Sequence, residues 1–219
     1  HYVREVKTSE LFPYRDQTYN MNSYLHTLLM SYYPSERGPY NLNTVDMQSD
    51  GHLANPQSNW GGIMRKIDQS DFEASNIEYV EFWLLDPFIY NKETAKGGSM
   101  YINLGEISEE VLKDEKKFFE NGMPINDDPA AIETTVWGKV PKRQGTGYAF
   151  DNTAGARPKQ DVGFNGLTTA EEKDFPTYTE YISRLASIVS PDVLNQWSTD
   201  PFSPINDPGG DNFHHYRGA

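Results

Sequence analysis

Residues 77–85, with the sequence IEYVEFWLL, form the most strand-like stretch of the chain and decide the expected fold. Successive side chains of a strand point to opposite faces, and this stretch places apolar side chains on both. A strand that is apolar on both faces is typical of the centre of a sheet. Glu78 and Glu81 interrupt the two faces, and a buried carboxylate needs a donor or water. We therefore expect a central strand, with Glu81 near the sheet edge or paired to an arginine, or else acting as a general acid.

The region around this stretch, residues 60–104, predicts a second strand beside it. Asp86-Pro87 ends the first strand, because proline cannot donate a ladder hydrogen bond. A polar loop follows, and residues 99–104 (SMYINL) then resume the alternation of a strand. The two strands are expected to form a hairpin or to neighbour each other in one sheet. Two more segments have strand character: 24–33 (YLHTLLMSYY), which could also be a short helix, and 134–140 (TTVWGKV).

The second half of the chain carries helix patterns. A first helix is expected to begin at Ser108 and to end at Asn121-Gly122, with an apolar stripe on one side and lysines on the other. A second has a capping box that joins Thr168 to Glu171, and it should break or restart at Phe175-Pro176.

After this break the sequence predicts an amphipathic helix and then a shorter one. The apolar stripe of the longer helix comprises Tyr178, Tyr181, Ile182, Leu185 and Ile188. The shorter helix opens at Ser190-Pro191, since proline is favoured in a first helical turn. Its inward-facing residues are expected to be Val193, Leu194 and Trp197.

Composition narrows the possible classes of protein. The chain has 19 Lys and Arg against 32 Asp and Glu, and its net charge of -13 disfavours nucleic acid or an anionic membrane surface as a partner. The 13% aromatic content, with 17 Gly and 14 Pro, is typical of a β-rich, turn-rich extracytoplasmic domain. The lack of cysteine excludes disulfides and a thiolate zinc site. The first residue is His1 and the last residues show no terminating pattern, so we expect a piece of a longer protein.

Seven segments spread over about 135 residues carry a family resemblance because they occur in one fixed order. They are Tyr32–Asn41 (YYPSERGPYN), Trp60–Arg65 (WGGIMR), Asp71–Phe88 (DFEASNIEYVEFWLLDPF), Tyr101–Ser108 (YINLGEIS), Phe118–Pro124 (FFENGMP), Thr135–Pro141 (TVWGKVP) and Gln160–Leu167 (QDVGFNGL). In these segments the chain resembles the SprA/Sov family, the very large outer-membrane translocon of the type 9 secretion system, also known as the gliding-motility cell-surface protein. The polar loops at 43–59 and 123–133 do not share the resemblance.

This resemblance implies a giant barrel that conducts folded cargo across the outer membrane and carries soluble insertions. The chain would be one such insertion, located at the outer membrane on the periplasmic or the cell-surface side. The implied function is that of a non-catalytic structural and interaction module that serves protein export and gliding motility. The implied partners are the remainder of the same polypeptide, outer-membrane and periplasmic secretion proteins, and secreted cargo. The family has no catalytic residues to carry over, so we assign no catalytic, cofactor-binding or metal residue and no cofactor.

The fold expectation rests on a second resemblance. The pattern Glu81-Phe82-Trp83 followed by 98–105 resembles the jelly-roll sandwiches of carbohydrate-binding modules. The expected fold is therefore mainly β with α, a jelly-roll-like β-sandwich that carries two or three peripheral helices. Residues 1–59 would form an extended arm and connector, and residues 60–219 the sandwich with helical additions, in a single domain overall.

Two other functions stay open at this point. The main alternative is a carbohydrate-binding β-sandwich, in which Trp60, Trp137 or Tyr148 would stack on sugar rings. The next is hydrolysis by a pair of carboxylates.

Acidic residues suggest two kinds of site. A hydrolytic pair could consist of Glu78 with Glu106, or of Asp86 with another acid, although abundant acids produce such pairs by chance. Calcium could bind in the Asn- and Asp-rich loops or near Asp207 and Asp211, although the twelve-residue calcium-loop pattern is missing.

Overall fold

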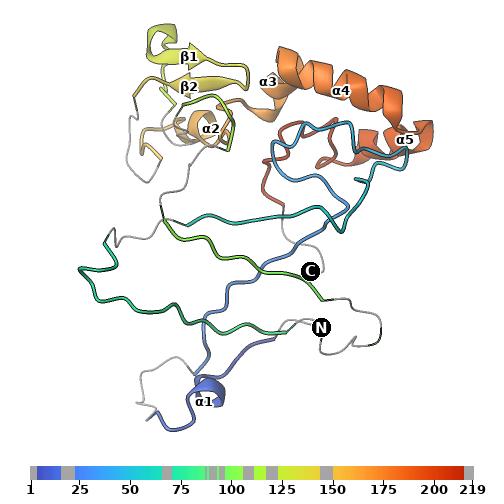
Figure 1. Ribbon diagram of the computed structural model, residues 1–219. Helices are drawn as coiled ribbons and strands as arrows, with labels where there is room; N and C mark the ends of the chain where they lie inside the picture. Colours follow the sequence, from blue (N-terminus) through green and yellow to red (C-terminus); the bar gives the residue numbers. More distant parts are fainter. Residues whose placement is uncertain are drawn as a thin grey trace. The chain divides into compact units, whose positions relative to one another are not determined.

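The computed structural model spans residues 1–219 and describes residues 4–15, 23–65, 71–86, 88, 93, 97–105, 111–116, 123–143 and 150–214 (Figure 1). The chain divides into two compact units, which we describe separately. The first comprises residues 1–32 and 62–105, and the second comprises residues 33–61 and 106–219. The boundary between residues 59 and 60 that the sequence suggested stays a prediction.

The first unit contains little regular structure in its described residues. Its helix, α1 (Thr8–Leu11), is a single turn. An isolated antiparallel bridge pairs Lys7 with Tyr24, and the ring of Phe12 meets that of Trp83 edge to face, with centroids 6.5 Å apart. The remaining described segments of this unit, including 77–85 and 97–105, run as chain without helix or strand (Figure 1).

The expected β-sandwich is wrong. The described residues form a single sheet of two strands, β1 (Ile132–Thr134) and β2 (Lys139–Pro141), and the segment 77–85 is not one of them. Its large side chains are exposed on both faces, so it is not the doubly covered central strand that we expected. The physical reason is that alternation and β-propensity describe how side chains suit a pleated surface. They do not supply the neighbouring strands that would cover it.

The two strands form a hairpin in which Ile132 pairs with Pro141 and Thr134 with Lys139. The predicted single strand 134–140 is therefore wrong, because the chain reverses within it. The turn is closed by a hydrogen bond of 2.8 Å from Thr135 N to the Gly138 carbonyl. A short helix, η2 (Pro129–Ala131), precedes the hairpin, and another, α2 (Arg157–Gln160), follows it.

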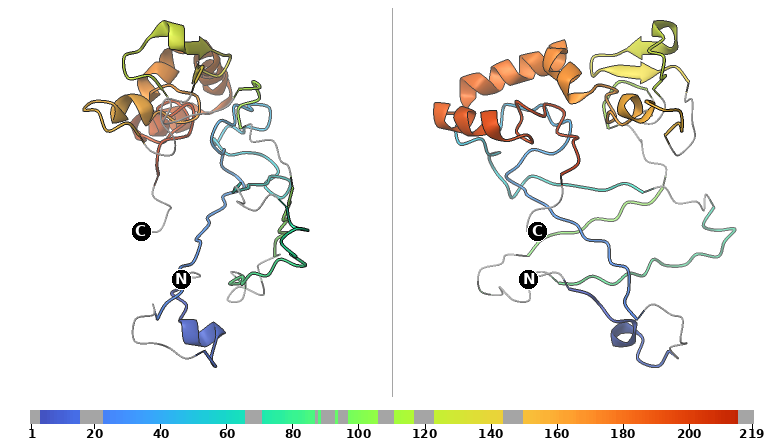
Figure 2. Two further views of the ribbon diagram at one scale, coloured as in Figure 1. Left: turned by 90° about the vertical axis from the view of Figure 1, so that its left-hand side faces the viewer. Right: turned by 180° about the vertical axis from the view of Figure 1, so that it is seen from behind.

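The helices after residue 167 confirm the sequence patterns (Figures 1 and 2). Helix α3 (Thr169–Asp174) begins with the complete capping box between Thr168 and Glu171. Helix α4 (Pro176–Ile188) restarts at the predicted proline, since proline suits a first helical turn. Helix α5 (Pro191–Thr199) is capped by the side chain of Ser190, which accepts a hydrogen bond from Val193 N.

The hydrophobic core of the second unit lies between these helices and the loop of residues 42–53. Its buried members are Met47, Leu53, Tyr181, Leu185 and Val189, and Leu42, Ile188, Val193, Leu194 and Trp197 pack against them. An isolated bridge between Met47 and Leu53 folds the loop back on itself. The predicted apolar stripes of α4 and α5 are therefore confirmed, and their partner is the polar-looking loop, of which Leu42, Met47 and Leu53 pack in the core while Val45 is exposed.

The helix expected to begin at Ser108 is described only in part. Residues 111–116 are not helical, although Leu112 is buried, and the rest of the expected helix lies outside the described residues. Among the described residues, none of the helices combines the length and the apolar character needed to cross a membrane.

Candidate functional site

Three carboxylates of the second unit lie close together and form what we call the acidic cluster: Glu172, Asp207 and Asp211. Glu172 lies on α3, and the two aspartates lie in the loop that follows α5. Their nearest carboxylate oxygens all fall within 4.8 Å of one another. Glu172 and Asp207 are buried and Asp211 is half-buried, so the cluster is a feature of the interior.

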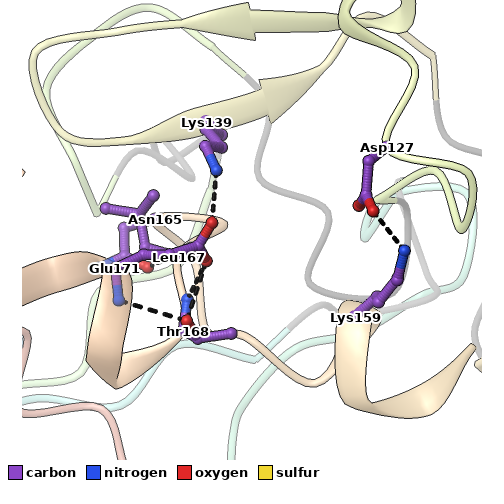
Figure 3. A network of polar contacts seen from close by, with 7 residues as sticks. All are labelled: Asp127, Lys139, Lys159, Asn165, Leu167, Thr168 and Glu171. Carbon is purple, nitrogen blue, oxygen red and sulfur yellow. Dashed lines mark hydrogen bonds and ion pairs between the residues drawn. The ribbon is translucent and has the colours of Figure 1, made fainter. Parts of the chain in front are cut away.

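Local sequence positions Glu172 through the start of α3. The capping box fixes the first turn: Thr168 N donates to Glu171 Oε2 at 2.9 Å, and Glu171 N donates to Thr168 Oγ1 at 3.3 Å (Figure 3). Lys139 of β2 also forms an ion pair of 2.5 Å with Glu171 (Figure 3). These contacts hold Glu171 on the outer side of α3 and leave its neighbour Glu172 facing the interior.

Each oxygen of the Glu172 carboxylate accepts a hydrogen bond. Asn165 Nδ2 donates to Oε1 at 2.5 Å, and Gly209 N donates to Oε2 at 2.9 Å. Asn165 Nδ2 also contacts Tyr178 Oη at 3.0 Å, and that hydroxyl donates to the Trp137 carbonyl at 2.9 Å. The carboxylate thus ends a chain of hydrogen bonds that reaches the turn of the hairpin.

The two aspartates are held by the backbone of their own loop and by one tyrosine. Asp207 Oδ1 accepts a hydrogen bond from Gly210 N at 3.1 Å, and its Oδ2 accepts one from Asn212 N at 3.3 Å. Asp211 Oδ2 accepts a hydrogen bond of 2.5 Å from Tyr40 Oη.

Arg37 brings a positive charge to this loop. Its guanidinium donates to the carbonyl of Asp207 at 2.5 Å and to that of Pro208 at 2.7 Å. It also lies over the Tyr181 ring, 5.3 Å from the centroid, which is a cation–π distance. The loop of the two aspartates is therefore fastened by residues that come from the distant segment 33–61.

Burial changes the acidity of these groups. Burial and, after it, the negative charge of Asp211 raise the pKa of Glu172 to about 7, against the hydrogen bonds from Gly209 and Asn165. Burial also raises the pKa of Asp211, although the hydrogen bond from Tyr40 opposes this. Two neighbouring buried carboxylates disfavour each other's ionisation, so the cluster retains a proton near neutral pH.

The cluster has the oxygen ligands that hard cations such as Ca²⁺ prefer. Glu172, Asp207 and Asp211 are the residues that could hold one. However, Glu172 and Asp207 already accept hydrogen bonds on both carboxylate oxygens, and the nearby Arg37 supplies a positive charge. The main role of the arrangement is therefore structural: its polar contacts connect α3, the loop 207–212 and the segment 33–61.

The structure brings together the two aspartates that the sequence suggested for calcium, and it adds Glu172, which sequence reasoning missed. The sequence feature that could have indicated Glu172 is the pair Glu171-Glu172 at the start of the helix. Because Glu171 is used in the capping box, the next residue, Glu172, points to another face of the helix. The position of Tyr40 and Arg37 had no comparable sign in the sequence.

The aromatic residues proposed for sugar stacking are not assembled into a platform in the described structure. Trp60 is 87% exposed, whereas Trp137 is half-buried in the hairpin turn. No ring contact joins these two among the residues that the structure describes. Tyr148 lies outside the described residues.

The acids proposed for hydrolysis are not members of the acidic cluster. Glu78, Glu81 and Asp86 are exposed, so the expectation of a carboxylate held within a covered strand is wrong. Glu106 lies outside the described residues.

A cavity of about 450 Å³ opens beside the hairpin. Its lining includes Met123, Ile125, Lys142, Arg143 and Asp151. The Lys142 ammonium group donates to the Ala130 carbonyl at 2.8 Å. The lining therefore mixes apolar and charged groups without a converging set of reactive side chains.

Comparisons with known proteins add no identity to this geometry. Protein-family models give no match to the chain, and a search of curated proteins gives none either.

Proposed function

We propose that the chain is a non-catalytic structural and interaction module of an outer-membrane, protein-conducting translocon that exports proteins in type 9 secretion and supports gliding motility. The proposal rests on the seven ordered segments that resemble the SprA/Sov family and on one structural observation. That observation is the exposure of long apolar segments in the first unit. It is independent of the resemblance and favours a protein that is completed by contact with others.

The exposed apolar residues are concentrated in continuous stretches. In 77–85, Tyr79 is 76% exposed and Trp83 is 63% exposed, and every other apolar side chain of the stretch is also exposed. The same holds for Met100, Tyr101, Ile102 and Leu104, and for Leu28, Leu29 and Met30. Contiguous exposed apolar surface of this kind marks contact sites in proteins that work in assemblies.

The energetic argument is that such side chains favour burial strongly. Covering one large apolar side chain stabilises a protein by about 1.5–3 kcal/mol. A partner that covers several of them gains enough to offset the cost of association. The second unit, in contrast, has its own buried core, so the chain combines a self-contained part with an incomplete one.

The carbohydrate-binding alternative loses its main support. It depended on a β-sandwich that presents aromatic residues, and the described residues contain only the two-stranded sheet.

Export assays in a bacterium with type 9 secretion test the proposal. The chromosomal copy of the sequence would carry Tyr79→Ser, Trp83→Ser and Leu84→Ser together. We expect cargo to disappear from the culture medium and gliding to stop, while the level of the altered protein stays unchanged in an immunoblot. Val45→Ser is the matched control, because Val45 is 89% exposed but lies outside these stretches. Normal export by the triple variant would contradict the proposal.

A further inference from the structure

We propose that residues 77–85 pair edge to edge with a β-strand of a partner that is apolar on both faces and carries Lys or Arg at the two positions facing Glu78 and Glu81. This inference rests on the proposed function, because it specifies the partner of the same exposed surface.

The first argument is the backbone. In the part of the chain that the structure describes, residues 78–85 make no backbone hydrogen bond, and the bond from Ile77 N to the Phe72 carbonyl (3.0 Å) closes the turn just before them. Each such N–H and C=O group seeks a partner, and a row of them is a template for an added strand. An extended peptide that adds a strand to such an edge uses these main-chain groups for affinity.

The second argument is the character of the two faces. One face carries Tyr79 and Trp83 and the other carries Phe82 and Leu84, all of them exposed. A strand that is to be covered on one side only has a polar second face. The partner must therefore contribute apolar side chains above and below the plane of pairing, as the interior strands of a sheet do.

The third argument is charge. Glu78 and Glu81 are the only charged residues in the stretch, and neither makes an ion pair among the described residues. They are three positions apart and so lie on opposite faces of an extended chain. Opposite charges directly across a strand pair stabilise it, and like charges destabilise it. A basic residue on each face of the partner strand satisfies both acids.

The same charges disfavour a second copy of the chain as the occupant. Parallel pairing in register places Glu78 against Glu78 and Glu81 against Glu81. Antiparallel pairing that keeps the whole stretch paired places Glu81 against Glu81. Both arrangements oppose like charges. The exposed stretch 97–105 of the same unit (GGSMYINLG) has no basic residue and so offers no match either.

Designed hairpin peptides test this inference on the full chain. One strand of each hairpin would be a free edge of nine residues, with lysines at the fifth and eighth positions for antiparallel pairing, or at the second and fifth for parallel pairing. Matched hairpins would carry glutamate at those positions. The binding constant would come from fluorescence anisotropy, and hydrogen exchange would show which amides become protected.

We expect one lysine hairpin to protect the amides of residues 78–85 and to bind about tenfold more tightly than its glutamate counterpart. The variant Glu78→Lys with Glu81→Lys should reverse this preference. Unchanged protection of α4 amides in the variant would show that the second unit is still folded.

Three results would overturn the inference: no protection of residues 78–85, equal affinity for the lysine and glutamate hairpins, or protection that rises with protein concentration without peptide. The last result would identify a second copy as the occupant. The export assay is independent of these measurements. If the lysine and glutamate hairpins bind equally well while export still depends on Tyr79 and Trp83, the strand partner is rejected and the proposed function stands.

Discussion

Tyr40 donates a hydrogen bond of 2.5 Å to Asp211, which lies 171 positions later in the chain. The same hydroxyl oxygen accepts a hydrogen bond of 2.6 Å from Phe164 N. One side chain therefore connects the segment 33–61, the loop before α3 and the loop after α5.

Removing the Tyr40 hydroxyl is expected to destabilise the protein. In Tyr40→Phe, the Asp211 carboxylate and the Phe164 amide both lose a partner in a largely buried place, and unsatisfied buried groups cost about 1–3 kcal/mol each. We expect urea denaturation to give a free energy of unfolding lower by about 2 kcal/mol. Tyr14→Phe serves as the control, because Tyr14 is 99% exposed. Equal stability of the two variants would show that the hydroxyl of Tyr40 contributes nothing.

The raised pKa of Glu172 predicts a definite pH dependence. Because the folded pKa of about 7 exceeds the ordinary glutamate pKa of 4.5, the folded state holds this proton more tightly than the unfolded state. The resulting stabilisation is complete below pH 4.5 and is lost as the pH rises toward 7. Its full size is on the order of 3 kcal/mol.

Urea unfolding at pH 5 and at pH 8 measures this dependence. Glu172→Gln keeps the size of the side chain and has no titrating proton, so the loss of stability between the two pH values should be smaller than in the natural chain. Other carboxylates titrate in both proteins, and the comparison cancels them. If the two proteins lose the same free energy, Glu172 does not titrate in this range.

Gly209 is predicted to be intolerant of a side chain. A Cβ atom at this position would meet the carboxylate of Glu172, whose Oε2 already accepts a hydrogen bond from Gly209 N. We expect Gly209→Ala to lower the free energy of unfolding by about 1–3 kcal/mol, as overpacking commonly does. Gly38→Ala is the matched control, since a Cβ there would meet no atom within 4 Å. A Gly209→Ala protein as stable as Gly38→Ala would mean that the acidic cluster is loosely packed.

Calcium is expected to have little effect on this protein. Both carboxylate oxygens of Glu172 and of Asp207 already accept hydrogen bonds from protein donors, so a cation would compete with those donors. Thermal unfolding with a chelator and with millimolar CaCl₂ should therefore give the same Tm. A rise of several degrees with calcium, absent from Asp211→Asn, would instead identify the cluster as a cation site.

The local parts of the fold could be predicted from the sequence. The capping box at Thr168, the restart at Pro176 and the cap at Ser190 depend on contacts within one helical turn. The sheet could not be predicted in this way, because strand pairing depends on which segments of the chain come together in the fold. The residues 77–85 have every local property of a buried strand and are exposed in the described structure.

The acidic cluster shows the same limit. Asp207 and Asp211 could be proposed from their spacing, but their contacts with Glu172, Tyr40 and Arg37 join parts of the chain that are far apart in sequence. Nothing in the loop 42–53 suggested that Met47 and Leu53 would complete the core of α4. Such long-range contacts follow from the folded arrangement and leave little mark on local patterns.

The hydrogen bonds between the segment 33–61 and the loop 207–212 determine when the second unit can fold during biosynthesis. Arg37 and Tyr40 leave the ribosome long before their hydrogen-bond acceptors, which lie 170 or 171 positions later in the chain. The second unit can therefore close only after residue 211 has emerged. During this interval the apolar stretches between residues 62 and 105 are already present in the nascent chain. A chaperone that shields them therefore acts from their synthesis until residue 211 has emerged.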